Sequence, residues 1–300
     1  MTEFFALVRR NTKLYFKDKG MFFTSLITPL ILLVLYSTFL ANIYEESFRA
    51  SLNAAGATVS DKVLWGCVGG ELISSLLAVS CVTVAFCSNL LMVLDKVSGA
   101  RKDLTIAPIK SGSFAIGYYC STLISTLLIC FAALIICLVY LAKVGWFLTV
   151  GDVAALALDV VLLVLFGTAL SSCIIFPLNT QGQASAVGTI ISAGYGFVCG
   201  AYMPISNFSK GLQRVISFLP GTYGTSLLRN HALRGVFSEM KSIGFPSEVV
   251  ESIKDSVDCN LYFFDKKVET GKMNLILIAS ILVLVGVYVG LNFLLSKKRK

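Results

Sequence analysis

Long apolar runs separated by short charged stretches dominate the hydropathy pattern of the chain. A helix needs about 20 residues to cross about 30 Å of hydrocarbon. The pattern therefore predicts an all-α integral membrane protein with six transmembrane helices, near residues 21–41, 64–94, 114–141, 153–176, 183–201 and 274–295. Pro29 is expected to kink the first span and Pro177 to end the fourth.

Residues 1–20 precede the first span and have the pattern of an amphipathic helix. Apolar side chains share one broad face at the 3.6-residue period. The basic residues Arg9, Arg10, Lys13 and Lys17 cluster on the opposite face. Such a helix lies in the membrane interface, with its basic side toward anionic headgroups. Contact with a cytoplasmic partner is an alternative use of the same face, and the two are compatible.

The distribution of Lys and Arg predicts that both termini are cytoplasmic. In that orientation the two short outer loops hold only Arg49, Lys62 and Lys143. The inner segments hold the basic helix, the tail 297–300 and the link between the second and third spans. Basic residues favour the cytoplasmic side in short loops, and the loop 202–273 is too long for this rule to apply.

The link between the second and third spans, residues 94–119, faces the cytoplasm in this topology. It is too short to be a domain, but it is long enough for a short helix that another protein could grip. We expect Arg101, Lys102 and Asp103 to be its polar contacts and Leu104 its apolar contact. A plain solvated loop is the alternative.

The fifth span carries small residues at every fourth position. Small residues in a row let two helix backbones approach closely in lipid, where packing replaces the hydrophobic driving force. The pattern favours a seam between two subunits, with packing inside one chain as the alternative. The residues are Ala184, Gly188, Ser192, Gly196 and Gly200.

Two acidic residues fall inside predicted spans, Glu71 in the second and Asp159 in the fourth. A charge at a helix centre costs about 2.5–3.5 kcal/mol on insertion scales, so such residues are often functional. One interpretation is that both lie near the outer interface and reach water. The other is that both line a translocation path.

The outer loop 202–273 divides into two parts. Residues 204–234 contain two short amphipathic runs that are too short to span the membrane, and they predict re-entrant or interfacial helices. Residues 235–272 form a polar insert, in which a short surface helix is expected to start near Ser247. The chain then ends with the sixth span and the basic tail within residues 274–300.

Composition narrows the function classes. The chain is 56% hydrophobic and 14% charged, whereas a soluble domain is about 25% charged. The net charge of +8 suits basic cytoplasmic ends better than nucleic-acid binding, because no nucleic-acid module is present. Eight of the nine cysteines lie in or beside apolar spans, and Cys259 lies alone in the polar loop. No CxxC pair supports a zinc site or a disulfide framework.

Motifs for catalysis are absent from the sequence. There is no GxxxxGK[ST] phosphate-binding loop and no GxSxG nucleophile elbow. The one histidine, His231, excludes HExxH and is expected to be interfacial. We therefore expect a chain that is not an enzyme and that holds no cofactor. Any ATP-driven activity would need a partner.

Taken in order, these parts resemble the membrane (permease) subunit of ABC type-2 family exporters. The link resembles a segment of that family through Lys96, Gly99, Leu104 and Pro108. The outer segment resembles another through Met203, Pro204, Ile205, Leu219, Pro220 and Arg229. The resemblance covers nearly all of residues 1–234 and 274–300. The insert 235–272 departs from compact members and is similar to permeases of Gram-positive bacteria.

The resemblance implies a multi-pass permease in the bacterial plasma membrane. Two ABC ATPase subunits would bind ATP and Mg²⁺, and a second permease would complete a homodimer or heterodimer. The ATPase would couple to the segment 95–113 and the basic helix, through Lys96, Arg101, Lys102, Asp103, Leu104, Pro108, Arg9, Arg10 and Lys13. The implied substrate is a hydrophobic or amphipathic drug, antibiotic or lipid. There are two alternatives. One is export of a lipid-linked glycan, and the other is a non-transporting scaffold or sensor that uses the outer loop.

Overall fold

The computed structural model describes residues 2–35, 38–39, 41–42, 45–46, 48–49, 60–106 and 111–297, which are mainly helical. The first helices are α1 (Thr2–Lys17), α2 (Lys19–Leu35), α4 (Asp61–Asn89), α5 (Leu91–Val97), α6 (Ala100–Ile106) and α7 (Ser111–Val144). Next come α8 (Val150–Ile175), α9 (Gln181–Val198), η2 (Ile205–Asn207), α10 (Lys210–Ile216) and α11 (Pro220–Ser242). The last elements are α12 (Ser247–Ser256), β1 (Leu261–Phe263), β2 (Lys266–Val268) and α13 (Thr270–Lys297).

Among the described residues, four helical stretches are long and apolar enough to cross a membrane. They are Asp61–Val97, Gly112–Val144, Val150–Ile175 and Thr270–Leu294. The α1–α2 pair, bent by 73°, makes a fifth candidate if it counts as one span. Of the six predicted spans, the one near 183–201 is missing from this set. Its helix, α9, has 18 residues rich in Gly, Ser and Thr, which lower its hydropathy. The number of crossings therefore stays a prediction.

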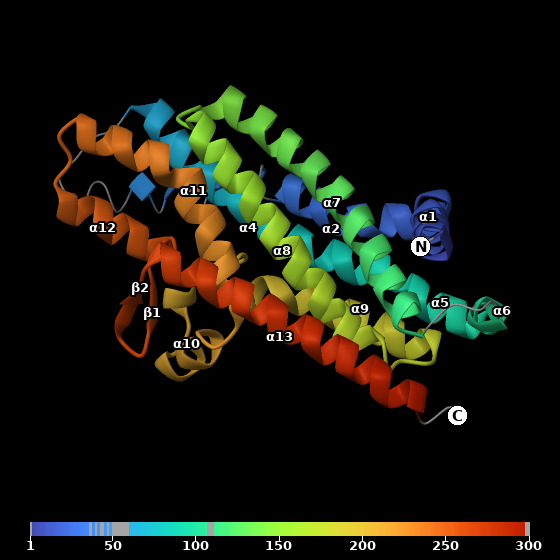
Figure 1. Cartoon of the computed structure of the whole chain (residues 1–300). Coiled ribbons are helices and arrows are strands. Elements are labelled where there is room, and N and C mark those ends of the chain that lie inside the picture. Colours follow the sequence, from blue (N-terminus) through green and yellow to red (C-terminus); the bar gives the residue numbers. More distant parts are fainter. Residues whose placement is uncertain are drawn as a thin grey trace.

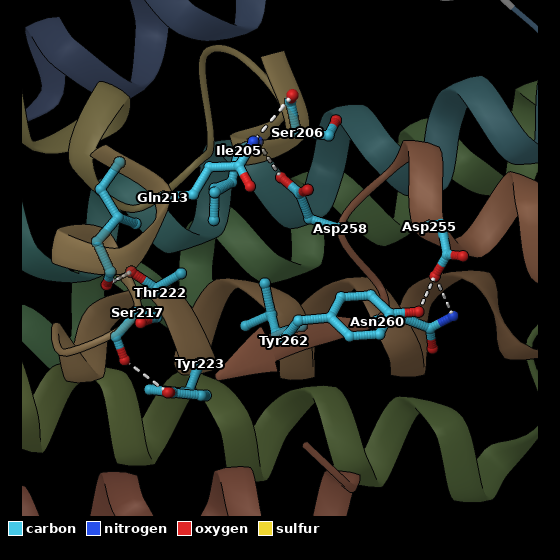
Figure 2. Close-up of a pocket in the computed structure, with 12 residues that line it drawn as sticks. Ile205, Ser206, Gln213, Ser217, Thr222, Tyr223, Asp255, Asp258, Asn260 and Tyr262 are labelled. Carbon is cyan, nitrogen blue, oxygen red and sulfur yellow. Dashed lines mark hydrogen bonds between the residues drawn. The ribbon is translucent and has the colours of Figure 1, made fainter. Parts of the chain in front are cut away.

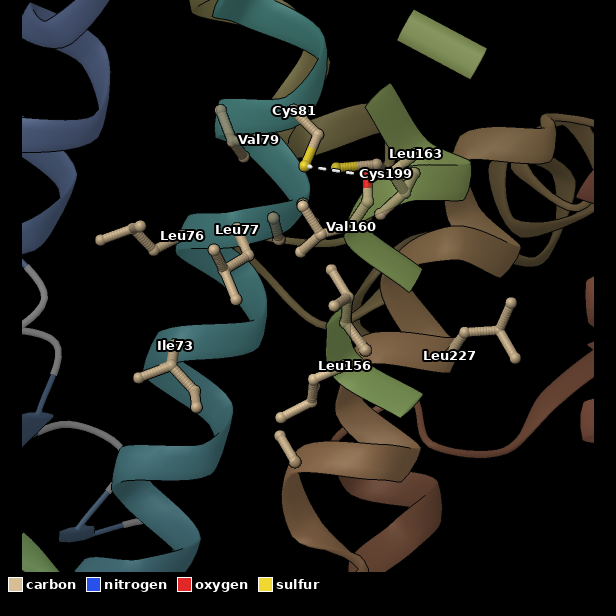
Figure 3. Close-up of a cluster of buried hydrophobic side chains, with 14 of the residues drawn as sticks. Ile73, Leu76, Leu77, Val79, Cys81, Leu156, Val160, Leu163, Cys199 and Leu227 are labelled. Carbon is tan, nitrogen blue, oxygen red and sulfur yellow. Dashed lines mark hydrogen bonds between the residues drawn. The ribbon is translucent and has the colours of Figure 1, made fainter. Parts of the chain in front are cut away.

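The helix α4 forms the centre of the bundle (Figure 1) and is buried along nearly its whole length. Cys81 of α4 lies beside Val160 of α8, and Leu77 of α4 and Leu156 of α8 belong to the same buried cluster (Figure 3). Gly167 of α8 also contributes to this contact, because it has no side chain. A Cβ on Gly167 would lie 2.9 Å from the Cys81 carbonyl oxygen, so glycine permits a close backbone approach of α8 to α4.

Local sequence signals account for the helix ends. The Ser60 side chain accepts from the Val63 amide at the start of α4. Thr149 and Asp152 form a capping box at the start of α8, which satisfies amides that lack helical partners. α8 ends at Ile175, as expected for a helix that meets Pro177. The Thr-x-x-Asp pattern and Pro177 thus set the two ends of α8.

The part of the chain between α9 and α13 differs most from expectation. The second of the two predicted short helices is the 23-residue α11, which extends into the stretch expected to be a polar insert. α12 begins at Ser247, the expected start of the surface helix. An antiparallel hairpin that was not predicted follows, with Leu261 opposite Val268 and Phe263 opposite Lys266. Over the described residues the fold is therefore helical with one small sheet rather than entirely α.

Candidate functional site

The predicted docking link begins in α5 and α6, which follow directly on α4. Ser98 and Gly99 separate the two helices, and Gly99 has φ of +83°. Figure 1 places α5, α6, α1 and the last turns of α13 toward the same end of the bundle. This end is the side that the charge pattern predicts to be cytoplasmic.

An ion pair fastens α1 to the link. Arg10 Nη1 lies 2.7 Å from Asp95 Oδ2, and Arg10 Nη2 donates to Asp95 Oδ1 at 3.1 Å. The Tyr118 hydroxyl of α7 donates to the same carboxylate at 2.5 Å. Asp95 is buried, and a bidentate Arg–carboxylate pair fixes geometry as well as charge. Arg10, predicted as a docking residue, therefore acts within the chain.

Two other predicted docking residues also face inward. Lys96 Nζ donates to the Leu178 carbonyl oxygen at 2.6 Å and to that of Phe176. The Arg101 guanidinium lies 5.7 Å from the Phe114 ring centre and 5.8 Å from that of Phe176. Lys96 thus binds carbonyls just beyond the C-terminal end of α8, where a cation is favourable. These contacts hold the link against the bundle.

The apolar residue that α6 exposes is not the predicted one. Leu104, expected to be the apolar contact, packs against a small core cluster that includes Leu7 and Phe114. Ile106 is instead 83% exposed. Lys102 and Asp103 are exposed, as are Arg9 and Lys13 of α1, whereas Pro108 lies outside the described residues. The docking surface that the structure offers on α6 is therefore Lys102, Asp103 and Ile106.

At the opposite end of α4, Glu71 takes part in a buried ion-pair network. Its Oε1 lies 2.7 Å from Arg229 Nη2 of α11, and Arg229 Nη1 lies 3.2 Å from Asp258 Oδ2. Arg229 also donates to the Gly200 carbonyl at 2.7 Å and to Ser75 Oγ at 3.2 Å. Burial raises the pKa of Asp258, and the Arg229 guanidinium opposes part of this rise.

Two further ion pairs join α11 to α8. His231 Nδ1 lies 2.5 Å from Asp159 Oδ2, and Arg234 pairs with Asp152. Asp159 and Glu71 are thus buried against α11 within the chain, and a role in lining a translocation path stays a prediction. His231, expected to be interfacial, has a partner inside the chain in Asp159. An acidic residue inside a span is usually paired with a basic one. The basic residues at 229, 231 and 234 were therefore the sequence signal that could have predicted these pairs.

The small-residue stripe of α9 is used largely inside the chain. Ala184 is buried, and a Cβ on Gly196 would meet the Tyr202 ring. A Cβ on Gly200 would lie 2.9 Å from Ile205 Cγ1. The alternative of packing within one chain therefore accounts for these three positions. Gly188 and Ser192 are only partly buried, and their place at a seam between subunits stays a prediction.

A pocket of about 270 Å³ lies between α10 and the hairpin (Figure 2). Many of its polar groups bond to one another. Tyr223 donates to the Ser217 carbonyl at 2.6 Å, and Asp255 accepts from Asn260 at 2.7 Å and from Tyr262 at 3.0 Å. The first bond closes the loop before α11, and the other two tie α12 to the hairpin. The Ile205 amide, which donates to Asp258 Oδ2 at 2.7 Å, joins the segment before α10 to the segment after α12.

The family comparison agrees with the order of these parts. The family model for ABC-2 type transporters matches residues 2–232, from α1 into α11. Among curated proteins, none matches the chain. The match spans well over half of the 300 residues and includes the link, the central helix α4 and the acidic residues of α8. The chain therefore belongs to the ABC-2 type transporter family and is a membrane-embedded permease subunit.

Proposed function

We propose that the chain is the transmembrane half of an ATP-driven exporter and that a separate ATPase grips α6. The observation that carries this proposal is the divided role of the link. Asp95, Lys96 and Arg101 fasten it to the bundle, while Ile106 is 83% exposed. A partner that moves this link also moves the helices fastened to it. Such a partner shifts a conformational equilibrium only through contacts that differ between its states.

Acidic substitutions at the exposed residues of α6 test the proposed contact with the ATPase. Lys102→Glu and Ile106→Asp, alone and together, are expected to reduce the ATPase recovered with the detergent-extracted permease. Lys143→Glu is the matched control, because Lys143 is an exposed lysine at the far end of α7. Membrane insertion should be equal for all variants. ATPase recovery that survives the double substitution would contradict the proposed grip. A wild-type permease that never carries an ATPase would favour the scaffold or sensor alternative.

The proposal includes six crossings, with α2 as the first and α9 as the fifth, and cytoplasmic termini in a bacterial plasma membrane. ATP and Mg²⁺ would be held by two ATPase subunits. A second permease, identical or similar, would complete the pathway. The outward face of α9 offers a surface for it, because Ile190 and Phe197 are 68% and 50% exposed and Ala193 lies between them. A cysteine at Ala193 should cross-link two copies, whereas one at the buried Ala184 should not.

The proposed substrate is a hydrophobic or amphipathic compound. A groove of about 370 Å³ between α2, α4 and α7 supports this class, because its lining is almost entirely apolar, including Leu30, Leu76 and Ile129. Ala132→Phe should fill the groove and weaken substrate-stimulated ATP hydrolysis in nanodiscs. Val139→Phe adds similar bulk at an exposed position of α7 outside the groove. Equal stimulation in both variants would contradict a role for the groove.

A further inference from the structure

A second polar pocket, of about 350 Å³, lies where α11, α12 and the start of α13 meet. Its lining contains four residues that can carry positive charge and no acidic residue. The lining residues are Asn230, His231, Arg234, Phe237, Ser238, Lys241, Lys254 and Thr270. None of them belongs to the α6 surface or to the apolar groove, so the proposed transport function leaves this pocket unexplained.

Two of these basic residues pair with acidic residues of α8 that do not line the pocket. Asp159 takes the Nδ1 nitrogen of His231, which leaves the Nε2 nitrogen for a ligand. Arg234 donates from Nε to Asp152, and its Nη2 pairs with the same carboxylate. The two N–H groups of Nη1 are then available to a ligand. The Arg234 side chain is 53% exposed, whereas Asp152 is buried. Each acid thus orients a base while remaining outside the pocket lining.

The two lysines of the pocket differ in how they are held. Lys254 Nζ lies 3.0 Å from Glu251 Oε1 and 5.7 Å from the centre of the Phe237 ring. One contact from the side leaves further ammonium donors for a ligand. Lys241 is exposed and makes no ion pair among the described residues. It therefore supplies positive charge that no carboxylate of the described chain offsets.

The position of the pocket indicates what can reach it. Thr270, which lines it, is also the first residue of the membrane-crossing stretch Thr270–Leu294. If this stretch crosses the membrane along its whole length, the pocket lies at the level where hydrocarbon gives way to headgroups. The N-terminal end of a helix is also the positive end of its dipole, and α13 has no acidic residue in its first turn.

We propose that this pocket binds a phosphate group. A phosphate offers several acceptor oxygens at once, which suits the donors of Arg234, Lys241 and Lys254, the cationic residues that line the pocket beside His231. Lysine and arginine are the residues that most often hold phosphate in proteins. The group can come from the headgroup of an anionic phospholipid or from a soluble phosphorylated compound. The proposal does not depend on ATPase coupling or on the direction of transport.

The experiment uses the full-length protein and separates the two sources. In the lipid arm, native mass spectrometry counts phosphatidylglycerol and phosphatidylcholine molecules that stay bound after detergent extraction. In the soluble arm, inorganic phosphate is titrated against the delipidated protein by calorimetry. The test variants are Lys241→Glu and Lys254→Gln, and Lys266→Glu is the control because Lys266 is exposed on the hairpin outside the pocket. Loss of a charge-assisted contact should weaken binding about tenfold or more.

Weaker retention of phosphatidylglycerol in Lys241→Glu, with retention unchanged in Lys266→Glu, would support a lipid headgroup in the pocket. Weaker binding of inorganic phosphate in the same variant, without a lipid preference, would support a soluble phosphorylated ligand. Equal binding by the wild type and both pocket variants in both arms would overturn the proposal.

Discussion

Two glycines with the same backbone conformation differ in their surroundings. Gly99, between α5 and α6, has φ of +83°, and Gly200, after α9, has φ of +77°. A Cβ on Gly99 would meet no described atom within 4 Å. A Cβ on Gly200 would lie 2.9 Å from Ile205 Cγ1 and 3.3 Å from Asp258 Oδ2. The first position thus requires glycine for its backbone only, and the second for its backbone and its packing.

We therefore expect Gly99→Ala to cost about 1–2 kcal/mol, the price of a left-handed backbone for an L-residue. Gly200→Ala should cost about 1–3 kcal/mol more, because the added methyl overpacks the site. Unfolding of the detergent-solubilised protein, followed by circular dichroism in denaturant, compares the two. Equal losses would show that the Ile205 and Asp258 side chains move aside without cost.

At the scale of elements, α11 is the unusual helix of the bundle. It is polar in composition, yet much of it is buried among α4, α8 and α13. Its bases at 229, 231 and 234 each pair with an acid of the surrounding elements. Removing one partner of a buried pair leaves an uncompensated charge, which is strongly destabilising. The Arg229 network contains two carboxylates and one guanidinium, so its members are not equivalent.

This asymmetry gives a prediction for the network. Arg229→Met should destabilise the protein by about 3–5 kcal/mol, because Glu71 and Asp258 lose their common cation. Glu71→Gln should cost less than about 1.5 kcal/mol, the scale of one net hydrogen bond. It leaves Arg229 paired with Asp258, and neither Glu71 oxygen accepts a well-aligned hydrogen bond. Denaturant unfolding of both variants tests the ranking. A larger loss in Glu71→Gln would contradict it.

The unit formed by α12 and the hairpin should depend on pH. Hydrogen bonds from Lys267 and Asn260, and then Lys254, lower the pKa of Glu251 from 4.5 to about 2. A carboxyl whose pKa is lowered by folding stabilises the fold above its unfolded pKa. This contribution is lost as pH falls from about 5 to about 2.

Amide hydrogen exchange over residues 261–268, corrected for intrinsic rates, should therefore speed up between pH 5 and pH 3. Glu251→Gln should remove most of this dependence, and Glu248→Gln, an exposed position of the same helix, should keep it. A pH dependence that persists in Glu251→Gln would assign the effect to other groups.

Elements with a periodic sequence signal could be predicted, and those without one could not. α1 follows from its amphipathic pattern, and α4, α7, α8 and α13 follow from their long apolar runs. The hairpin has no such signal. Its turn residues Phe264 and Asp265 have φ of +46° and +65°, where Gly or Asn is usual. The strands are only three residues long, too short for an alternation to be seen.

The sites were less predictable than the elements for a related reason. The charged link could be located from its composition, but the side chains that face outward could not. Leu104 and Ile106 are both apolar residues of α6, and only packing against the core cluster that includes Leu7 and Phe114 decides that Leu104 lies inside. The pairing of Glu71 with Arg229 joins residues far apart in the chain, and no local pattern encodes it.

At the scale of the whole molecule, α4 connects the two ends of the bundle. One end of it leads through α5 to the Asp95 contacts, and the other carries Glu71 and the α11 network. Between them, α4 packs closely on α8, where a Cβ on Gly167 would lie 2.9 Å from the Cys81 carbonyl oxygen and 3.0 Å from Val82 Cα. Both neighbours are backbone atoms, which cannot turn aside as a side chain can.

Gly167→Ala should therefore push α8 from α4 and destabilise the protein by about 1–3 kcal/mol, the usual cost of overpacking. Gly286→Ala is the matched control, because Gly286 is a helical glycine of α13 whose Cβ would meet nothing within 4 Å in the described part of the chain. Alanine there should be neutral or stabilise the helix by up to about 1 kcal/mol. Unfolding in detergent measures both effects. If Gly167→Ala is as stable as the control, the two helices can separate at this level without cost. α4 would then be free to move past α8, and it could not carry motion rigidly between the link and the α11 network.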